Sequence, residues 1–285
     1  MEMAILQFLI WPIIASLVIA GIHAYLGLHV VERGVIFVDL SLAQIASLGA
    51  TLALLVPAFG GDPHSPAVYW MSLGFTLIGA AIFSFIKGHD ARIPQEAIIG
   101  ISYAVASAAV IVAMSKSTGE SEHLKDMLVG NILSVSPDDI IKTGLLYVVI
   151  GAFHYVFRKR FLLISTDPKG AAALGIPIRF WDFLFYASFG VVVTRSVAIA
   201  GVLLVFCYLI VPSVAAMLYA ERIAPRLAIG WVMGVVVSML GMYFSVEFDL
   251  PTGATMVCTF GAVLVLMALV KVAFARVAVQ KRAVA

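Results

Sequence analysis

The stretch RSVAIAGVLLVFCYLIVPSVAAML (195–218) decides the fold class of this 285-residue chain. After Arg195 it holds no charged residue, and about 20 apolar residues suffice to cross a bilayer as an α-helix. Similar runs fill most of the chain, whose mean hydropathy is +1.08. Only 12% of the residues are charged, against about 25% in soluble domains. We therefore expect an all-α, polytopic integral membrane helix bundle that forms a single domain over residues 1–285.

The apolar runs between charged or Pro/Gly breaks predict about eight or nine transmembrane helices. The first run is too long for a cleaved signal peptide and carries Glu2 in place of a basic segment, so we expect a retained span. The sixth predicted span is short and could form a broken unit with the seventh around residues 194–196. The predicted spans are 4–28, 37–58, 66–86, 95–114, 139–157, 180–194, 198–219, 227–246 and 254–274.

The loops between these spans differ in charge. Loops on one side hold 14 of the 18 Lys and Arg residues, and the other side holds 4. The positive-inside rule makes the first side cytoplasmic, so we expect the N-terminus outside and the C-terminus inside. The opposite face is acidic and contains His64 and His123. Such loops could attract cations, or they could be ordinary solvated loops.

The segment ISTDPKGAAALGIPIRFW (164–181) is a polar island on the predicted cytoplasmic side. Thr166 or Asp167 can cap a short helix, with Pro168 at its first position. Alanines 171–173 propagate the helix, Gly175 ends it, and Pro177 prevents continuation. We expect a helix of about two turns within residues 165–177, whose small side chains suit either a docking surface or a simple interfacial turn.

Several kinds of chemistry have no motif in the sequence. There is no Gly-Lys dipeptide, so the chain has no Walker phosphate-binding loop and does not hydrolyse ATP by that route. H-E-x-x-H, CxxC and G-x-S-x-G are also absent. Cys207 and Cys258 fall inside apolar runs and are expected to be small buried side chains. A carrier or channel is therefore favoured, and an enzyme is the least supported class.

The island resembles the coupling helix of ATP-binding-cassette (ABC) importer permeases, above all the permeases that import zinc, manganese or iron(II), where a "DPxxAxxxGIP"-like loop is typical. Four further segments, in the same order, are similar to that family. They are QEAIIGI (95–101), LVGNILSVSPDDI (128–140), the 195–218 span and DLPTGATMV (249–257).

This resemblance implies a membrane permease subunit of an ABC importer for a divalent transition metal ion. A separate cytoplasmic ATPase subunit would bind ATP, and this chain would bind no cofactor itself. Two copies of the chain would form one pore, and an extracytoplasmic metal-binding protein would deliver the metal. The residues implied to contact the ATPase are Asp167, Pro168, Ala171, Ala172, Gly175, Ile176 and Pro177.

Two other functions stay open at this point. One is an ABC permease for a metal chelate or a cobalamin-like cargo, and the other is an ATP-independent secondary transporter or channel.

The residues expected along the translocation path are Asp39, Gln44, Glu96, Pro212 and Asp249. Pro212 lies inside a span, where it should kink the helix and free the Tyr208 carbonyl, which Ser213 or a water could help to satisfy.

The segment VERGVIFVDLSLAQIASLGA (31–50) resembles the family pattern "R-x-x-x-x-G-D-x-L-x-H-A-x-x-x-G", in which an Asp and a His share one helical face. Counting from Arg33 aligns Asp39 with the aspartate but puts Ala43 at the histidine. Counting back from Gly49 puts Gln44 there instead. Asp39 is therefore the one candidate metal ligand, or else a helix N-cap. Without the histidine, an oxygen-preferring ion or a looser cation path becomes more plausible.

Overall fold

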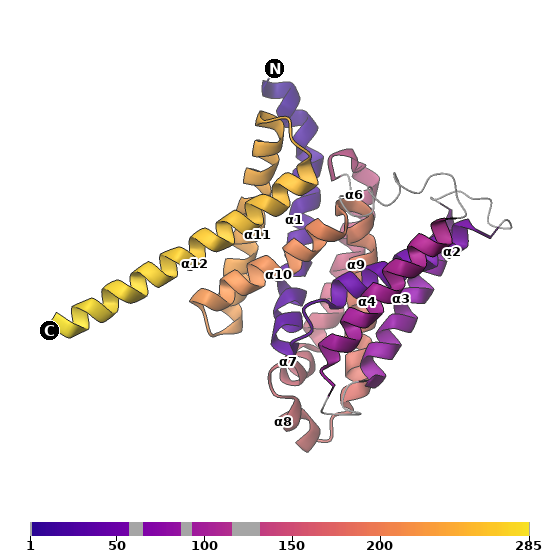
Figure 1. Ribbon diagram of the computed structural model, residues 1–285, viewed down its shortest axis with the longest axis horizontal. Coiled ribbons are helices and arrows are strands. Elements are labelled where there is room, and N and C mark those ends of the chain that lie inside the picture. Colours follow the sequence, from indigo (N-terminus) through magenta and orange to yellow (C-terminus); the bar gives the residue numbers. More distant parts are fainter. Residues whose placement is uncertain (1, 57–64, 87–92, 116–131, 285) are drawn as a thin grey trace. The chain divides into compact units, whose positions relative to one another are not determined.

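The computed structural model describes residues 2–56, 65–86, 93–115 and 132–284, and the regular structure in these ranges is helical (Figure 1). Short turns separate α1 from α2, α9 from α10, α10 from α11 and α11 from α12, and two small helices lie between α6 and α9. The elements are α1 (Glu2–Arg33), α2 (Val38–Leu54), α3 (Pro66–Ile86), α4 (Gln95–Met114), η2 (Ile132–Ser134), α6 (Pro137–Val156), α7 (Arg158–Thr166), α8 (Pro168–Ala173), α9 (Ile178–Ala200), α10 (Val202–Tyr219), α11 (Ile223–Glu247) and α12 (Thr252–Val284).

The prediction of an all-helical bundle with about eight or nine spans is confirmed. Eight of the described helices are long and apolar enough to cross a membrane. The second predicted span, 37–58, corresponds to α2, which is also apolar but has only 17 residues. At 1.5 Å per residue this helix is about 25 Å long, close to the lower limit for crossing a bilayer.

The predicted break around residues 194–196, between the sixth and seventh spans, is wrong. Helix α9 runs without interruption for 23 residues through Arg195, and it ends at Gly201, whose φ of 76° is a left-handed value that favours glycine. Arg195 does not interrupt the helix because its Nε donates a hydrogen bond to Thr143 Oγ1 of α6, at 2.9 Å. The next residue, Ser196, bonds Tyr147 of the same neighbouring helix.

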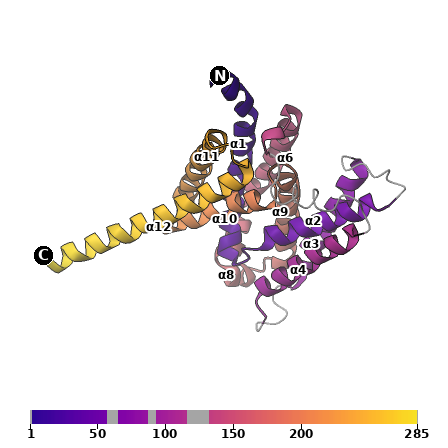
Figure 2. The same ribbon diagram turned by 45° about the horizontal axis from the view of Figure 1, so that its top comes forward.

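The chain divides into two compact units, and the second unit contains residues 29–130 and 141–202. Here α2 packs against α3, α4 and α9, and Figures 1 and 2 both show α2, α3 and α4 side by side. Glycines bring these helices together. A methyl group built on Gly49 would lie 2.7 Å from the Met71 carbonyl oxygen of α3. Close backbone contact of this kind is typical of membrane helix interfaces.

The first unit contains residues 1–28, 131–140 and 203–285, and so includes α10, α11, α12 and most of α1. Gly230 and Gly234 of α11 face Ala24 and Ala20 of α1, as their small-xxx-small spacing predicts. Helix α12 packs against α11 but exposes much of its apolar surface. Cys207 is buried as expected, whereas Cys258 is exposed because it lies on this open side of α12.

Candidate functional site

The predicted island folds as a short capped helix. Asp167 is the N-cap residue of α8, and its Oδ1 accepts a hydrogen bond from the Gly170 N–H at 2.9 Å. Pro168 follows at the first helical position, where its missing N–H costs nothing. Of the two predicted caps, Asp167 is therefore the one used. Thr166 instead donates its hydroxyl to the Leu162 carbonyl inside α7.

The C-terminal end of α8 forms a Schellman motif. Gly175 has a φ of 71°, which a glycine adopts without strain. Its N–H donates to the Ala172 carbonyl at 3.0 Å, and the Ile176 N–H donates to the Ala171 carbonyl at 3.2 Å. Pro177 then becomes the N-cap residue of α9. Both ends of α8 are thus fixed by bonds within residues 167–176.

One side of α8 faces the protein and the other is open. Ala171 is fully buried, whereas Ala172, Gly175 and the proline on either side are exposed. Leu174, which was not among the predicted contact residues, is 72% exposed. An exposed leucine on a short polar segment provides an apolar contact for another protein.

Asp39 lies in the first turn of α2 and is 1% exposed. It is not the N-cap residue. Phe37 holds that position without a side-chain cap, so the N-cap alternative for Asp39 is wrong. The Oδ1 atom of Asp39 has no hydrogen-bond partner among the described residues. A buried carboxylate oxygen in this state has a free lone pair for a cation.

Glu96 supplies the cap that α2 lacks. It lies in the first turn of α4, and its Oε1 accepts a hydrogen bond from the Phe37 N–H at 3.0 Å. Its other oxygen, Oε2, has no hydrogen-bond partner within the described part of the chain. Asp39 and Glu96 are close enough to interact electrostatically. The structure therefore brings two of the predicted path residues together, each at a helix N-terminus, where a carboxylate is stabilised.

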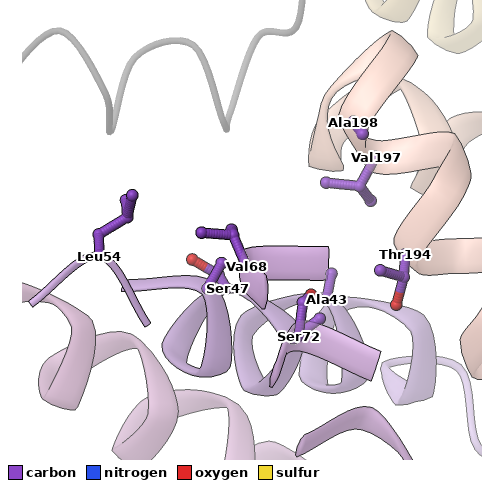
Figure 3. A pocket seen from close by; sticks show the side chains of 10 residues that line it. Ala43, Ser47, Leu54, Val68, Ser72, Thr194, Val197 and Ala198 are labelled. Atoms are coloured by element: carbon purple, nitrogen blue, oxygen red, sulfur yellow. The ribbon is translucent and has the colours of Figure 1, made fainter. Parts of the chain in front are cut away.

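One turn along α2 from this carboxylate pair, Ala43 lines a cavity of about 170 Å³. Figure 3 shows Thr194 and Val197 of α9 across from Ser47 of α2 and Ser72 of α3. The wall is mostly apolar, with three hydroxyl-bearing side chains. Its lining residues are Ala43, Ala46, Ser47, Ala50, Leu54, Val68, Ser72, Thr194, Val197 and Ala198.

The two possible alignments of α2 differ in what they bring to this cavity. Ala43 lies on the same helical face as Asp39, four residues away. Gln44 is buried but is not among the residues that line the cavity. Within the described ranges, no group of three or more His, Cys, Asp or Glu side chains is arranged to hold a metal ion. The charged groups that could attract a cation near the start of α2 are the carboxylates of Asp39 and Glu96.

The remaining path candidates lie in the first unit. Pro212 is inside the continuous helix α10, and the neighbouring Ser213 hydroxyl donates to the Leu209 carbonyl at 2.9 Å, one residue beyond the predicted Tyr208. Asp249 is exposed in the turn between α11 and α12 and has a φ of 51°. This left-handed position ends α11, and Asp tolerates it better than most residues.

Other sequence features have simpler explanations in the structure. His23 bonds the Ile19 carbonyl in its own helix, and His154 stacks on Phe161 with ring centroids 4.4 Å apart. Both are packed side chains within the helix bundle. His64, His123 and Gly130 lie outside the described residues.

An ion pair that the sequence did not reveal lies beside the short helices. Arg33, the last residue of α1, donates from Nη1 to Asp182 Oδ1 of α9 at 2.5 Å. The two side chains are 1% and 0% exposed. Their positions are 149 residues apart in the chain. The sequence signal that could have suggested the pair is one acid, Asp182, within an otherwise apolar predicted span.

The fold and these features define a polytopic all-helical membrane protein with a short capped helix set between two spans. Residues 5–271 match the ABC 3 transport family, and the chain belongs to this family. It is a transport permease.

Individual relatives agree with this assignment. The "Manganese transport system membrane protein MntC" of Listeria innocua is 28% identical over 226 residues, which cover 74% of this chain and 79% of the relative. The "Probable iron transport system membrane protein" of Haemophilus influenzae is 24% identical over 251 residues, covering 88% and 89%. Among solved structures, PsaBC from Streptococcus pneumoniae in complex with Fab has a TM-score of 0.76, with 25% identity and 92% of each chain covered.

Proposed function

We propose that this chain is the membrane permease subunit of an ABC importer for a divalent transition metal ion, namely zinc, manganese or iron(II). The observation that carries the proposal is the family match over residues 5–271. The names of the relatives add support, because they refer to manganese and to iron transport. In this proposal residues 1–285 act as one permease domain.

The contact with the ATPase is assigned to α8 and the turn that follows it. Asp167, Pro168, Ala172 and Gly175 are exposed there, and Leu174 offers an apolar side chain. Ala171 and the Schellman bonds hold this surface in place from behind. A separate ATPase subunit binds and hydrolyses ATP, and its closure pushes on α8 and changes access to the path.

The path for the ion is assigned to the face of α2 that carries Asp39. The buried free oxygens of Asp39 and Glu96 support this assignment, because hard and borderline divalent cations favour carboxylate ligands. The metal ion is cargo here and must leave the site again. An incomplete coordination shell with few protein ligands therefore suits release as well as binding. Pro212 is assigned to the path as a residue that distorts α10. Asp249 is assigned to the path as an acidic residue at its outer entrance.

The cavity lined by Ala43, one turn along α2 from Asp39, favours a small cargo. Its volume of about 170 Å³ lies below the roughly 300–1,000 Å³ of sites for drug-sized ligands. A water molecule takes about 30 Å³, so the cavity suits an ion with several waters better than a cobalamin-like chelate. The absence of an imidazole at Ala43 favours manganese or iron(II) over zinc, because zinc takes nitrogen ligands readily.

The proposed assembly has two permease copies, two cytoplasmic ATPase subunits and an extracytoplasmic metal-binding protein. The chain lies in a bacterial or archaeal plasma (inner) membrane with its N-terminus outside and its C-terminus in the cytoplasm. The uneven distribution of Lys and Arg residues among the loops supports this orientation.

The test is metal-dependent ATP hydrolysis by the reconstituted complex. The complex in proteoliposomes is assayed with zinc, manganese and iron(II) separately, and both hydrolysis and uptake are measured. We expect one of these metals to stimulate both activities. Uptake by the purified chain alone, driven by an ion gradient, would instead favour a secondary transporter. Stimulation by a cobalamin-like compound alone would favour the larger cargo.

A further inference from the structure

Arg33 is held by three groups at once. Besides the ion pair with Asp182, its Nε donates to Ser165 Oγ of α7 at 2.8 Å. Its guanidinium also lies over the Phe185 ring, 4.0 Å from the centroid. The planar fork of arginine allows these contacts together, and a lysine has no second donor in that geometry. The end of α1 is thereby fixed to both α7 and α9.

Ser165 is the point where these contacts meet. The Ser165 hydroxyl donates to the Phe161 carbonyl at 2.9 Å. The Nδ1 atom of His29 lies 2.8 Å from Ser165 Oγ. A hydroxyl has one proton and two lone pairs, so Ser165 can accept from both Arg33 and His29 while it donates to Phe161. Ser165 is buried, and every hydrogen-bonding position of its oxygen is used.

The network is connected directly to the proposed docking helix. Ser165 lies two residues before Asp167, the N-cap residue of α8. Asp167 is also the C-cap residue of α7, where its N–H donates to the Leu163 carbonyl at 2.8 Å. There is no loose residue between α7 and α8. A displacement of α8 therefore pulls on α7 at Ser165.

The other end of the network is connected just as closely to α2. Gly34 follows Arg33 with a φ of 67° and ends α1 with the same pair of turn bonds that ends α8. Only residues 34–37 separate the two helices, and Val38 donates to the Val35 carbonyl at 3.1 Å. Asp39 lies in the first turn after this connection.

We propose that Ser165, together with the Arg33–Asp182 pair, is the mechanical link through which movement of α8 reaches α2 and the carboxylate of Asp39. This inference rests on the proposed function, because it requires that an ATPase acts on α8. Ser165 and Arg33 are positioning residues in this scheme and do not touch the cargo. A buried ion pair suits the task better than an apolar contact, because its geometry is directional and its separation is costly.

The test uses Ser165→Ala in the complete complex in proteoliposomes. This variant removes the shared acceptor but leaves the ion pair intact. We expect the number of metal ions imported per ATP hydrolysed to fall about three-fold or more, the factor associated with one hydrogen bond, while ATP hydrolysis continues. The matched control is Ser84→Ala in α3, because Ser84 is buried in the same unit and, within the described ranges, its hydroxyl bonds the Ala81 carbonyl of its own helix.

A second variant covers the case in which Ser165→Ala fails to assemble. Arg33→Lys keeps the charge beside Asp182 and loses the bond from Nε to Ser165, so the ratio should fall in the same way. An unchanged ratio in either assembled variant overturns the link, provided that the unmodified complex transports metal. If the unmodified complex shows neither metal-stimulated hydrolysis nor uptake, the proposed function fails instead.

Discussion

Replacing Gly175 by valine tests whether the shape of the turn after α8 matters for transport. A Cβ built on Gly175 meets nothing within 4 Å, so the substitution has no steric cost from neighbouring atoms. Its cost comes from the φ of 71°. A left-handed residue with a side chain costs about 1–2 kcal/mol, which shifts the local equilibrium against this turn by about 5- to 30-fold.

Two hydrogen bonds depend on this conformation, from Gly175 to Ala172 and from Ile176 to Ala171. When the turn relaxes, the C-terminal end of α8 changes direction while its Asp167 cap is unaffected. In the reconstituted complex we expect ATP hydrolysis to continue with less metal imported per ATP. The thermal unfolding midpoint should change little, because the turn is exposed.

Gly175→Asn is the matched control, because asparagine carries a side chain but tolerates the left-handed region. It should retain most of the coupling. If the valine variant imports as much metal per ATP as the unmodified complex, the turn has no role in coupling and the assignment of α8 is wrong.

Three further substitutions test other parts of the structure. Gly27→Ala should destabilise the protein by about 1–3 kcal/mol or more in thermal unfolding, because the new Cβ would lie 1.9 Å from the Leu209 carbonyl oxygen. The control is Gly21→Ala in the same helix, whose Cβ meets nothing within 4 Å and which should be neutral. Asp39→Asn should lower metal uptake by about ten-fold or more, a change of about 1.4 kcal/mol, and normal uptake would exclude Asp39 from the path. Asp249→Asn keeps the left-handed turn, so the unfolding temperature should not fall. Metal uptake should be slower at low ionic strength, and an equal slowing of uptake at high salt would contradict an electrostatic role.

The short helix α8 could be predicted residue by residue because its determinants are local. The cap, the first-turn proline, the alanines and the ending glycine all act within residues 167–177. A single sequence contains this information in full. The helix spans were predictable for a similar reason, since crossing a bilayer depends on the composition of one continuous segment.

The parts that the sequence did not predict depend on contacts between distant segments. Arg195 suggested a break within what is α9, but the helix continues because Thr143 of another helix accepts a hydrogen bond from the Arg195 side chain. Asp39 could be taken for a cap because the group that bonds the Phe37 N–H is Glu96, 59 residues away. Pairings across helices leave no periodic pattern in one chain, so they could not be inferred without the structure.

The capped form of α8 also affects how tightly a partner can bind. The bonds that cap both ends of this helix lie within residues 167–176, so a partner protein is not needed to hold its ends. Binding to a preorganised segment avoids the conformational entropy of ordering it, which otherwise weakens association. The free energy of association can then drive movement of the spans, and the partner's affinity should depend more on the side chains displayed by α8 than on its helical propensity.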